Sequence, residues 1–331
     1  IISWLLILGV GMGVSCIVFS LIYKMPIVTA WSTPGAAFLI TSVEGFSLAE
    51  VTGAFIISAL LGLLTAQFKP IINAIERIPP ALSAAMLAGI LLPFCLRIFE
   101  HAQHTPLIVM LFLSVYLIGS RWLPKYLMLL LLVFATLTTA VLSPAESFDI
   151  KLEAPTLMWV TPEFTLSAAV GLAFPLFLIT MLSQNLPGIA ILHSHKYFPN
   201  TQNIMRGVSG LQLATAPLGG FTFNLAAITA ALCMGENAGG KPQHRYLASI
   251  MAGCGYLIAG LLAGSVVLIF TQMPPVITHL LAGLALLSTL QSSLINAITG
   301  EKYRQAALLT LLCSASGIII VGVSAPVWGL A

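Results

Sequence analysis

The sequence predicts an all-α polytopic membrane protein that contains an inverted repeat. The composition supports this, because 59% of the 331 residues are hydrophobic and only 7% are charged, whereas soluble domains have about 25% charged residues. Successive apolar runs are long enough to cross a bilayer. Two stretches of the first half of the chain also recur in the second half. These features indicate a membrane protein of several crossings.

Twelve apolar segments can be counted between charged or proline-rich breaks. They lie near residues 1–23, 26–42, 49–68, 79–96, 106–120, 126–143, 166–191, 203–216, 220–234, 246–271, 276–298 and 305–323, and a further segment is expected from Pro326. The chain begins without methionine inside an apolar run and ends on another. We therefore expect one helix to precede the given chain and part of the last helix to follow it.

The basic residues orient the chain, because cytoplasmic loops of membrane proteins are rich in lysine and arginine. If the connection after residue 23 is cytoplasmic, eleven of the 13 basic residues fall inside and only Arg97 and Lys151 fall outside. The acidic residues Glu146, Asp149, Glu153 and Glu163 then also lie outside. We expect a multi-pass protein of the inner membrane, embedded in the lipid bilayer.

No pattern points to catalysis or to a cofactor. Nucleotide-binding loops, nucleophile elbows and metalloprotease helices are absent, so we expect neither an enzyme nor a nucleic-acid partner. The cysteines stand apart, which predicts small buried side chains without disulfides or metal: Cys16, Cys95, Cys233, Cys254 and Cys313. His101 and His104 are expected in a solvated outer loop. His279 is expected either as an interhelical hydrogen bonder or as a protonatable group.

A stretch near the beginning, from Val28 to Ala37, predicts a strand that becomes a helix inside the membrane. Thr33 precedes a proline and so disfavours helix, Pro34 suits a first helical turn, and Ser32 or Thr33 can cap it. A helix that begins at this depth exposes unpaired N–H groups. Such groups are tolerated beside protein or a cavity and can hold an anion.

The internal repeat gives this stretch a partner. The same pattern, Pro-Pro followed six or seven residues later by Ala-Gly, occurs in residues 78–92 and again in residues 273–287. The prolines of the two copies are 195 positions apart. Thr29-Ala30 is matched with Thr215-Ala216, 186 positions on, and the second copy continues to Asn224. An odd number of crossings separates the copies, so the second copy is inverted. Inverted repeats with broken segments are typical of transporters and mark the binding site.

The two broken segments predict one shared site. The half-helices expected after Pro34 and after Gly220 would point their N-termini toward one point and hold an anion without a basic residue. A third candidate is the pair Gln184 and Asn185, which either contacts the substrate or bonds across helices. The alternative for the breaks is packing kinks with lipid-facing aromatic residues. The expected substrate-binding residues are Trp31, Ser32, Thr33, Gly35, Gln184, Asn185, Gly219, Gly220, Phe221, Thr222 and Asn224.

The chain resembles the BenE family of benzoate:proton symporters over nearly its whole length. The resemblance is densest at residues 29–37, 83–92, 175–190 and 281–289. The family is distantly similar to the uracil permease and sulfate permease group, which implies fourteen segments in two inverted sevens. It implies a core domain at residues 1–68 and 166–271 and a gate domain at 69–165 and 272–331. A homodimer is one assembly that fits this expectation.

The resemblance implies an elevator-like symporter of protons with benzoate or a related aromatic carboxylate. Gln184 stands where nucleobase permeases have a glutamate, and its amide can donate to a carboxylate. The core segments contain no acidic residue at mid-depth, so the proton travels either on the substrate or on the helix expected before residue 1. A permease for a nucleobase or an inorganic anion is an alternative. A passive anion channel or a non-transporting receptor is another.

Overall fold

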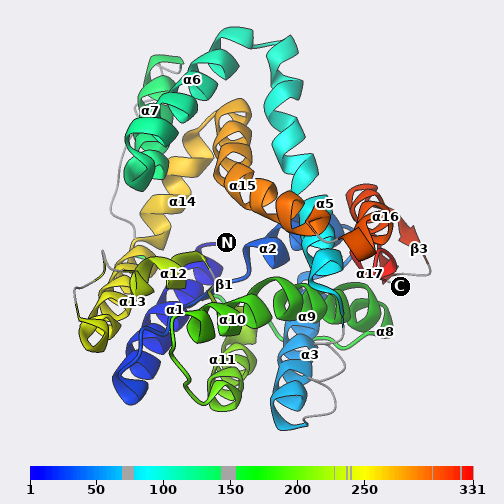
Figure 1. Cartoon of the computed structure of the whole chain (residues 1–331). Coiled ribbons are helices and arrows are strands. Elements are labelled where there is room, and N and C mark those ends of the chain that lie inside the picture. Colours follow the sequence, from blue (N-terminus) through cyan, green and yellow to red (C-terminus); the bar gives the residue numbers. More distant parts are fainter. Residues whose placement is uncertain are drawn as a thin grey trace.

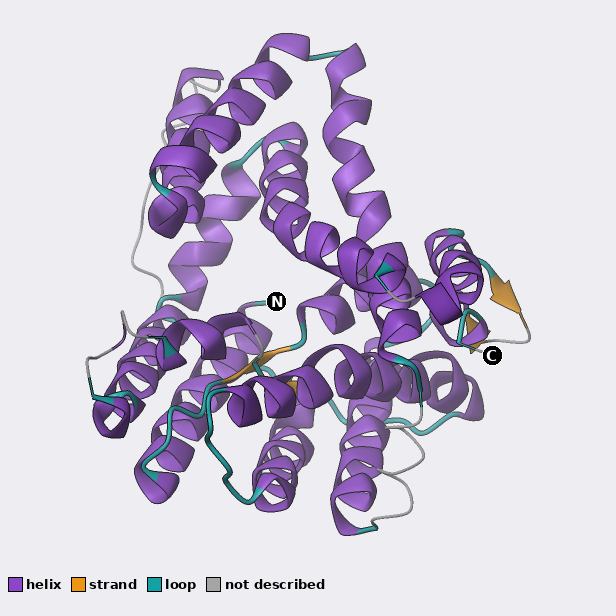
Figure 2. Cartoon of the chain, viewed as in Figure 1, coloured by secondary structure: helices purple, strands orange, loops and turns teal. Residues whose placement is uncertain are grey.

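The computed structural model describes residues 1–68, 78–142, 154–226, 228–235, 238, 241–299, 301–320 and 323–330. Lys69, Arg77, Lys151 and the acidic residues from Glu146 to Glu153 lie outside the described residues. The described chain is mainly helical with a few short strands (Figures 1 and 2). Helices dominate because backbone N–H and C=O groups in a bilayer must be paired within the protein. The predicted fold class is confirmed at this level.

Five helical stretches of the described chain are long and apolar enough to cross a membrane. They are α1 (Ile2–Tyr23), α3 (Leu48–Gln67), α5 (Pro80–Glu100) with η1 (His101–Gln103), the stretch Leu166–Ser194, and α15 (Pro275–Ile298). A sixth crossing is formed if η7 (Pro242–His244) and α13 (Tyr246–Leu261) continue into α14 (Ala263–Gln272) through a bend of 65°. The sequence predicted one unbroken run at 246–271, because no proline marks this bend.

Shorter elements fill the remaining described chain. They are α2 (Thr33–Ser42), α6 (Pro106–Trp122), η2 (Pro124–Tyr126), α7 (Leu127–Leu142), α11 (Thr201–Thr215), η5 (Ala216–Leu218), α12 (Ile228–Met234), η8 (Glu301–Tyr303), α16 (Arg304–Ala315), α17 (Ala325–Trp328) and the strands β1 (Thr29–Trp31), β2 (Phe223–Leu225), β3 (Ile319–Ile320) and β4 (Val323–Ser324). The predicted segment 305–323 is thus wrong at its end, where Gly317 adopts a φ of 67° and the chain turns into strands.

The stretch Leu166–Ser194 is a helix with two π-helical insertions. It consists of α8 (Leu166–Ala168), η3 (Ala169–Ala173), α9 (Phe174–Thr180), η4 (Met181–Asn185) and α10 (Leu186–Ser194), of which η3 and η4 are π-helical. Such insertions are rare and occur often at functional sites. The second one carries Gln184 and Asn185.

The buried side chains form two main clusters. The larger one joins α1, α2, α3, β2 and the helices from α8 to α12 with most of α5, and it includes Leu290 of α15. The smaller one joins α6, α7 and α15 with the end of α5, and its members are Ile98, Val109, Phe112, Leu127, Leu131, Ala135, Met273, Ile277, Leu280 and Leu284. Figure 1 shows the second group standing above the first, with α14 running between them.

The cysteines and histidines differ in part from expectation. Cys16, Cys95 and Cys233 are buried as predicted, but Cys254 and Cys313 are half-buried because neighbouring helices cover them incompletely. The solvated loop expected for His101 is wrong. Its Nε2 lies 2.9 Å from Nδ1 of His279, and the two rings stack. This contact confirms His279 as an interhelical hydrogen bonder.

Candidate functional site

The site is organised around a two-stranded ribbon of β1 and β2. The strands pair antiparallel, with Thr29 opposite Leu225, Ala30 opposite Asn224 and Trp31 opposite Phe223. The bond from the N–H of Ala226 to the carbonyl of Val28 extends this pairing. The two helices after the strands leave the ribbon in opposite directions, so both N-termini face it (Figure 1).

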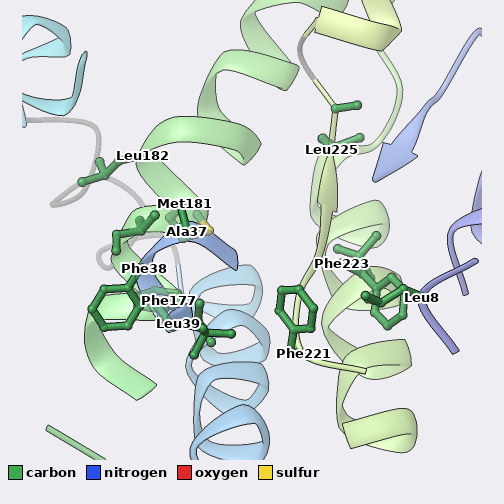
Figure 3. Packing of buried hydrophobic residues seen from close by; sticks show 14 of the residues in the cluster. Leu8, Ala37, Phe38, Leu39, Phe177, Met181, Leu182, Phe221, Phe223 and Leu225 are labelled. Atoms are coloured by element: carbon green, nitrogen blue, oxygen red, sulfur yellow. The ribbon is translucent and has the colours of Figure 1, made fainter. Parts of the chain in front are cut away.

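The ribbon is anchored to α1 through Thr29. The N–H of Thr29 donates to Sγ of Cys16 at 3.1 Å, and its hydroxyl contacts the hydroxyl of Ser15. Phe223 packs on the same helix beside Gly11, where a Cβ atom would collide with the ring. Figure 3 shows Phe223 extending from its strand toward Leu8 of α1. One side of the ribbon is therefore filled by protein.

Ser32 sets the start of α2. Its Oγ accepts from the N–H of Gly35 at 3.0 Å, and its own N–H donates to Oγ1 of Thr222 at 3.2 Å. Of the two caps that the sequence allowed, Ser32 is thus the one used. Thr33 is half-buried, and within the described part of the chain neither its N–H nor its hydroxyl has a hydrogen-bond partner. The expectation of several free N–H groups here is wrong, because Pro34 has none and Ser32 satisfies those of Gly35 and Ala36.

The second broken segment differs from its prediction. Gly219 has a φ of 103° and Gly220 follows it in a turn, and the chain then stays extended to Leu225. Aromatic and β-branched residues such as Phe221, Thr222 and Phe223 favour this extended form. The half-helix begins at Ile228, so the prediction that it begins after Gly220 is wrong.

The register of the repeat is corrected by the same observation. α2 and α12 begin at Thr33 and Ile228, 195 positions apart, and α5 and α15 begin at Pro80 and Pro275 with the same offset. With this offset, β1 of the first repeat corresponds to β2 of the second repeat. The predicted match of Thr29-Ala30 with Thr215-Ala216 is therefore wrong. A two-residue match in an apolar sequence is too short to set a register.

Four aromatic side chains meet beside the ribbon. The ring of Phe221 lies 6.1 Å from Trp31, 6.0 Å from Trp4 and 5.8 Å from Phe55, measured between centroids. Phe221 is only 3% exposed, whereas Trp31 is 38% exposed. Phe221 is therefore not lipid-facing, and Figure 3 shows it on the segment that leads into β2. We call Trp4, Trp31, Phe55 and Phe221 the aromatic cluster.

The glycines of the site permit close approach. A Cβ atom at Gly219 would collide with the indole of Trp4, and one at Gly220 would collide with the side chain of Thr215. A Cβ at Gly35 would lie 2.9 Å from Oγ of Ser32. The three glycines thus shape the two breaks through packing.

The two amides on η4 have different surroundings. Oδ1 of Asn185 accepts from the N–H of Leu225 at 3.0 Å, and its Nδ2 donates to the sulfur of Met181 at 3.3 Å. Asn185 therefore holds β2 against the π-helical insertion. Gln184 is half-buried and has no hydrogen bond to another described residue. Of the two, Gln184 keeps its amide available for a ligand.

Asn224 lies at the centre of the ribbon and is fully buried. Its Nδ2 donates to the carbonyl of Leu225 at 3.1 Å, and its Oδ1 has no partner in the described part of the protein. The segments around it, residues 26–42, 181–192 and 219–235, contain no Asp, Glu, Lys, Arg or His. Among the described residues no group of three or more His, Cys, Asp or Glu side chains could hold a metal.

Two cavities lie away from the ribbon. One of about 70 Å³ separates Phe38 and Ser42 of α2 from Gly89, Ile90 and Pro93 of α5, with Ser314 also in its wall. The other, of about 310 Å³, lies between Thr65 at the end of α3 and Asn200 at the start of α11. The first lies at the boundary between the half-helix α2 and the long helix α5.

Comparison with known proteins places the chain in a family. Residues 1–331 match the BenE family, described as benzoate membrane transport protein. The chain is 36% identical to the inner membrane protein YdcO of Escherichia coli strain K12 over 328 residues, 99% of this chain and 84% of that one. It is also 36% identical to the benzoate membrane transport protein of Acinetobacter baylyi over 329 residues, with the same coverage of 99% and 84%.

Solved structures show the same fold at low sequence identity. The transmembrane domain of a cyanobacterium bicarbonate transporter, BicA, has a TM-score of 0.62 and 14% identity, covering 96% of this chain and 94% of that one. SLC26A9 has a TM-score of 0.56 and 14% identity, covering 95% of this chain and 61% of that one. These likenesses concern the fold and confirm the predicted inverted-repeat transporter architecture.

Proposed function

Because the chain belongs to the BenE family of benzoate membrane transport proteins, we propose that it is a proton-coupled symporter of benzoate or a related aromatic carboxylate. The chain is a multi-pass transporter of the inner membrane. The name of the Acinetobacter relative supports benzoate as the substrate class. The proton coupling and the type of movement are parts of the proposal.

The observation that carries the proposal is the ribbon with its aromatic cluster. Half-exposed Trp31 offers a flat apolar surface, on which an aromatic ring can stack. Thr33, at the start of α2, and Gln184 offer neutral hydrogen-bonding groups that the described protein does not use. A ligand with one aromatic and one carboxyl end fits this set. In this proposal Phe221, Thr222 and Asn224 line the site. The residues that shape it by packing and hydrogen bonding are Ser32, Gly35, Asn185, Gly219 and Gly220.

We propose that the site moves by an elevator mechanism, in which a core domain slides against a gate domain. Residues 1–68 and 166–271 form a core domain that carries the ribbon, and residues 69–165 and 272–331 form a gate domain. The apolar cluster of α6, α7 and α15 supports a gate with packing of its own at this end, while most of α5 packs in the larger cluster. The cavity between α2 and α5 supports a boundary along which the two domains slide.

Uptake into proteoliposomes tests the function. Labelled benzoate should accumulate under an inward proton gradient, and an uncoupler should abolish the accumulation. Competition by uracil and sulfate, added separately, tests the alternative substrates. Absence of gradient-driven benzoate uptake would reject the proposal, and uptake of sulfate or uracil in its place would support a different permease. Ion currents far above carrier turnover would indicate a channel.

A further inference from the structure

We propose that the site binds its aromatic acid in the neutral, protonated form, with the acid O–H donated to Oδ1 of Asn224. This inference rests on the proposed function, since it takes the substrate to be an aromatic carboxylic acid. It assigns the transported proton to the substrate's own carboxyl group. No titratable side chain of the ribbon then needs to carry it.

The first reason is the unpaired acceptor of Asn224. The side chain is fully buried, and in the described protein its Oδ1 has no donor. The orientation of the amide follows from its neighbour, because the carbonyl of Leu225 can only accept and so must face Nδ2, at 3.1 Å. A buried carbonyl without a donor is unfavourable. A ligand that brings a donor removes this cost.

The position of Asn224 on the ribbon is the second reason. Directly opposite residues of an antiparallel pair share one face, so Asn224 shares its face with Ala30. Thr29, Trp31 and Phe223 belong to the other face, and Thr29 and Phe223 pack against α1. Ala30 is only half-buried. Val28, Ser32, Thr222 and Ala226 on the same face are buried, so Ala30 is the one place beside the free oxygen that the described protein leaves partly uncovered.

The charge and the donor count form the third reason. An ionised carboxylate only accepts hydrogen bonds, whereas a neutral acid has one O–H donor and one C=O acceptor. Around the ribbon, residues 26–42, 181–192 and 219–235 provide no cation. At α2 only the N–H of Thr33 remains free, because Gly35 and Ala36 donate to Ser32. A buried anion would be poorly paired here and would face the oxygen of Asn224, and burial favours the neutral form of an acid.

Charged groups on the elements packed around β2 lie elsewhere. On α1, Cys16 contacts Thr29 on the other face of the ribbon, and Lys24 follows the end of the helix. On α11, Arg206 donates to Gln67 at 2.8 Å. His193 lies in the last turn of α10, and η4 and β1 contain no charged residue. None of these side chains is a hydrogen-bond partner of Asn224 among the described residues.

The proton balance of the cycle is simple. On the outer side the benzoate anion takes one proton from water and binds as benzoic acid. On the inner side the O–H bond breaks, and the anion and the proton both enter the cytoplasm. One anion and one proton cross together, so the transport step moves no net charge and should not respond to membrane potential.

Binding measurements at several pH values test the inference. Titration of benzoate into the purified protein in nanodiscs, between about pH 5 and pH 8, should show Kd rising about tenfold per pH unit above the pKa of the acid. Ring-substituted benzoic acids of lower or higher pKa should shift this profile by the difference in their own pKa. A profile that keeps one midpoint for all acids would assign the proton to a protein group and overturn the inference.

Neutral analogues supply a second test. Benzamide has an N–H donor and a C=O acceptor and should displace labelled benzoate with an affinity that does not change with pH. Methyl benzoate lacks the donor and should compete at least tenfold more weakly. Equal competition by the two would show that Oδ1 of Asn224 receives no hydrogen bond. Benzoate uptake with a pH-independent Kd would reject the protonated form alone, whereas absence of benzoate uptake and binding at every pH would reject the proposed function as well.

Variants complete the experiment. Asn224→Leu should raise the Kd of benzoate and of benzamide at least tenfold. Ser114→Ala, on an exposed face of α6 where the hydroxyl bonds only to its own helix, is the control for expression and folding. Unchanged affinity of folded Asn224→Leu would overturn the inference.

Discussion

At the level of single residues, Ser32 links the cap of α2 to the second half of the site. Ser32→Ala removes the acceptor for Gly35, and loss of such a cap costs about 1 kcal/mol. We expect a lower Tm and slower benzoate uptake. Ser47→Ala is the matched control, because Ser47 caps α3 at an exposed position. It should lower Tm by a similar amount and leave uptake unchanged, and equal loss of uptake in both variants would contradict the role of Ser32.

The neighbouring amides Gln184 and Asn185 should respond differently to the same substitution. Asn185→Leu leaves the buried N–H of Leu225 unpaired, and we expect a loss of about 1–3 kcal/mol in stability. Gln184→Leu breaks no hydrogen bond with a described residue, so stability should change by less than about 0.5 kcal/mol. Benzoate affinity should nevertheless fall. Thermal unfolding and binding of both variants decide this, and a destabilised Gln184→Leu with normal affinity would contradict it.

Single residues also show what could be predicted from the sequence. The cap at Ser32 was predictable because it depends on three neighbouring residues and the following proline. The contact of His101 with His279 was not, because it joins positions 178 apart in the chain. The sequence also could not predict that Asn185 bonds to β2 while Gln184 does not, because this depends on which amide the π-helical turn directs toward β2.

At the level of elements, α1 and α13 are in close contact through glycine. A Cβ at Gly260 would lie 3.0 Å from Cα of Gly9, whereas one at Gly255 on the same helix meets nothing within 4 Å. Gly260→Ala should therefore separate the helices and lower Tm. Gly255→Ala should leave Tm unchanged or raise it, because alanine favours helix by about 1 kcal/mol over glycine. Equal Tm values for the two variants would contradict the close contact.

Among the elements, prediction succeeded where the signal was local and failed where it was distant. The break before α2 follows from Thr33 and Pro34, and the long apolar helices follow from their composition. The start of α12 at Ile228 depends on the pairing of β2 with β1, and that partner lies in the other half of the chain. The bend at Leu262 has no proline beside it. Each π-helical insertion ends two residues before a proline, Pro175 or Pro187, but a proline alone does not distinguish a π-helical turn from a kink.

At the level of the whole molecule, the proposed elevator predicts that the boundary between α2 and α5 must slide. Cysteines introduced at Ser42 and Pro93, which line one cavity, in a background without native cysteines, should be joined by a reducible bifunctional reagent. Uptake should then stop and return on reduction. The control pair replaces His101 and His279, which are in contact inside the proposed gate. A link there should leave uptake intact, and continued uptake with α2 linked to α5 would contradict the sliding.

The ribbon also has a consequence for biogenesis. Each strand comes from a different half of the chain, so Trp31 finds its partner Phe223 only after roughly 190 further residues have been synthesised. At about 5–20 residues per second this takes on the order of 10–40 s. During that time the extended backbone of β1 has no strand beside it, although it is already surrounded by membrane helices. Assembly of the ribbon therefore waits for the second half of the chain and is a late event in biogenesis.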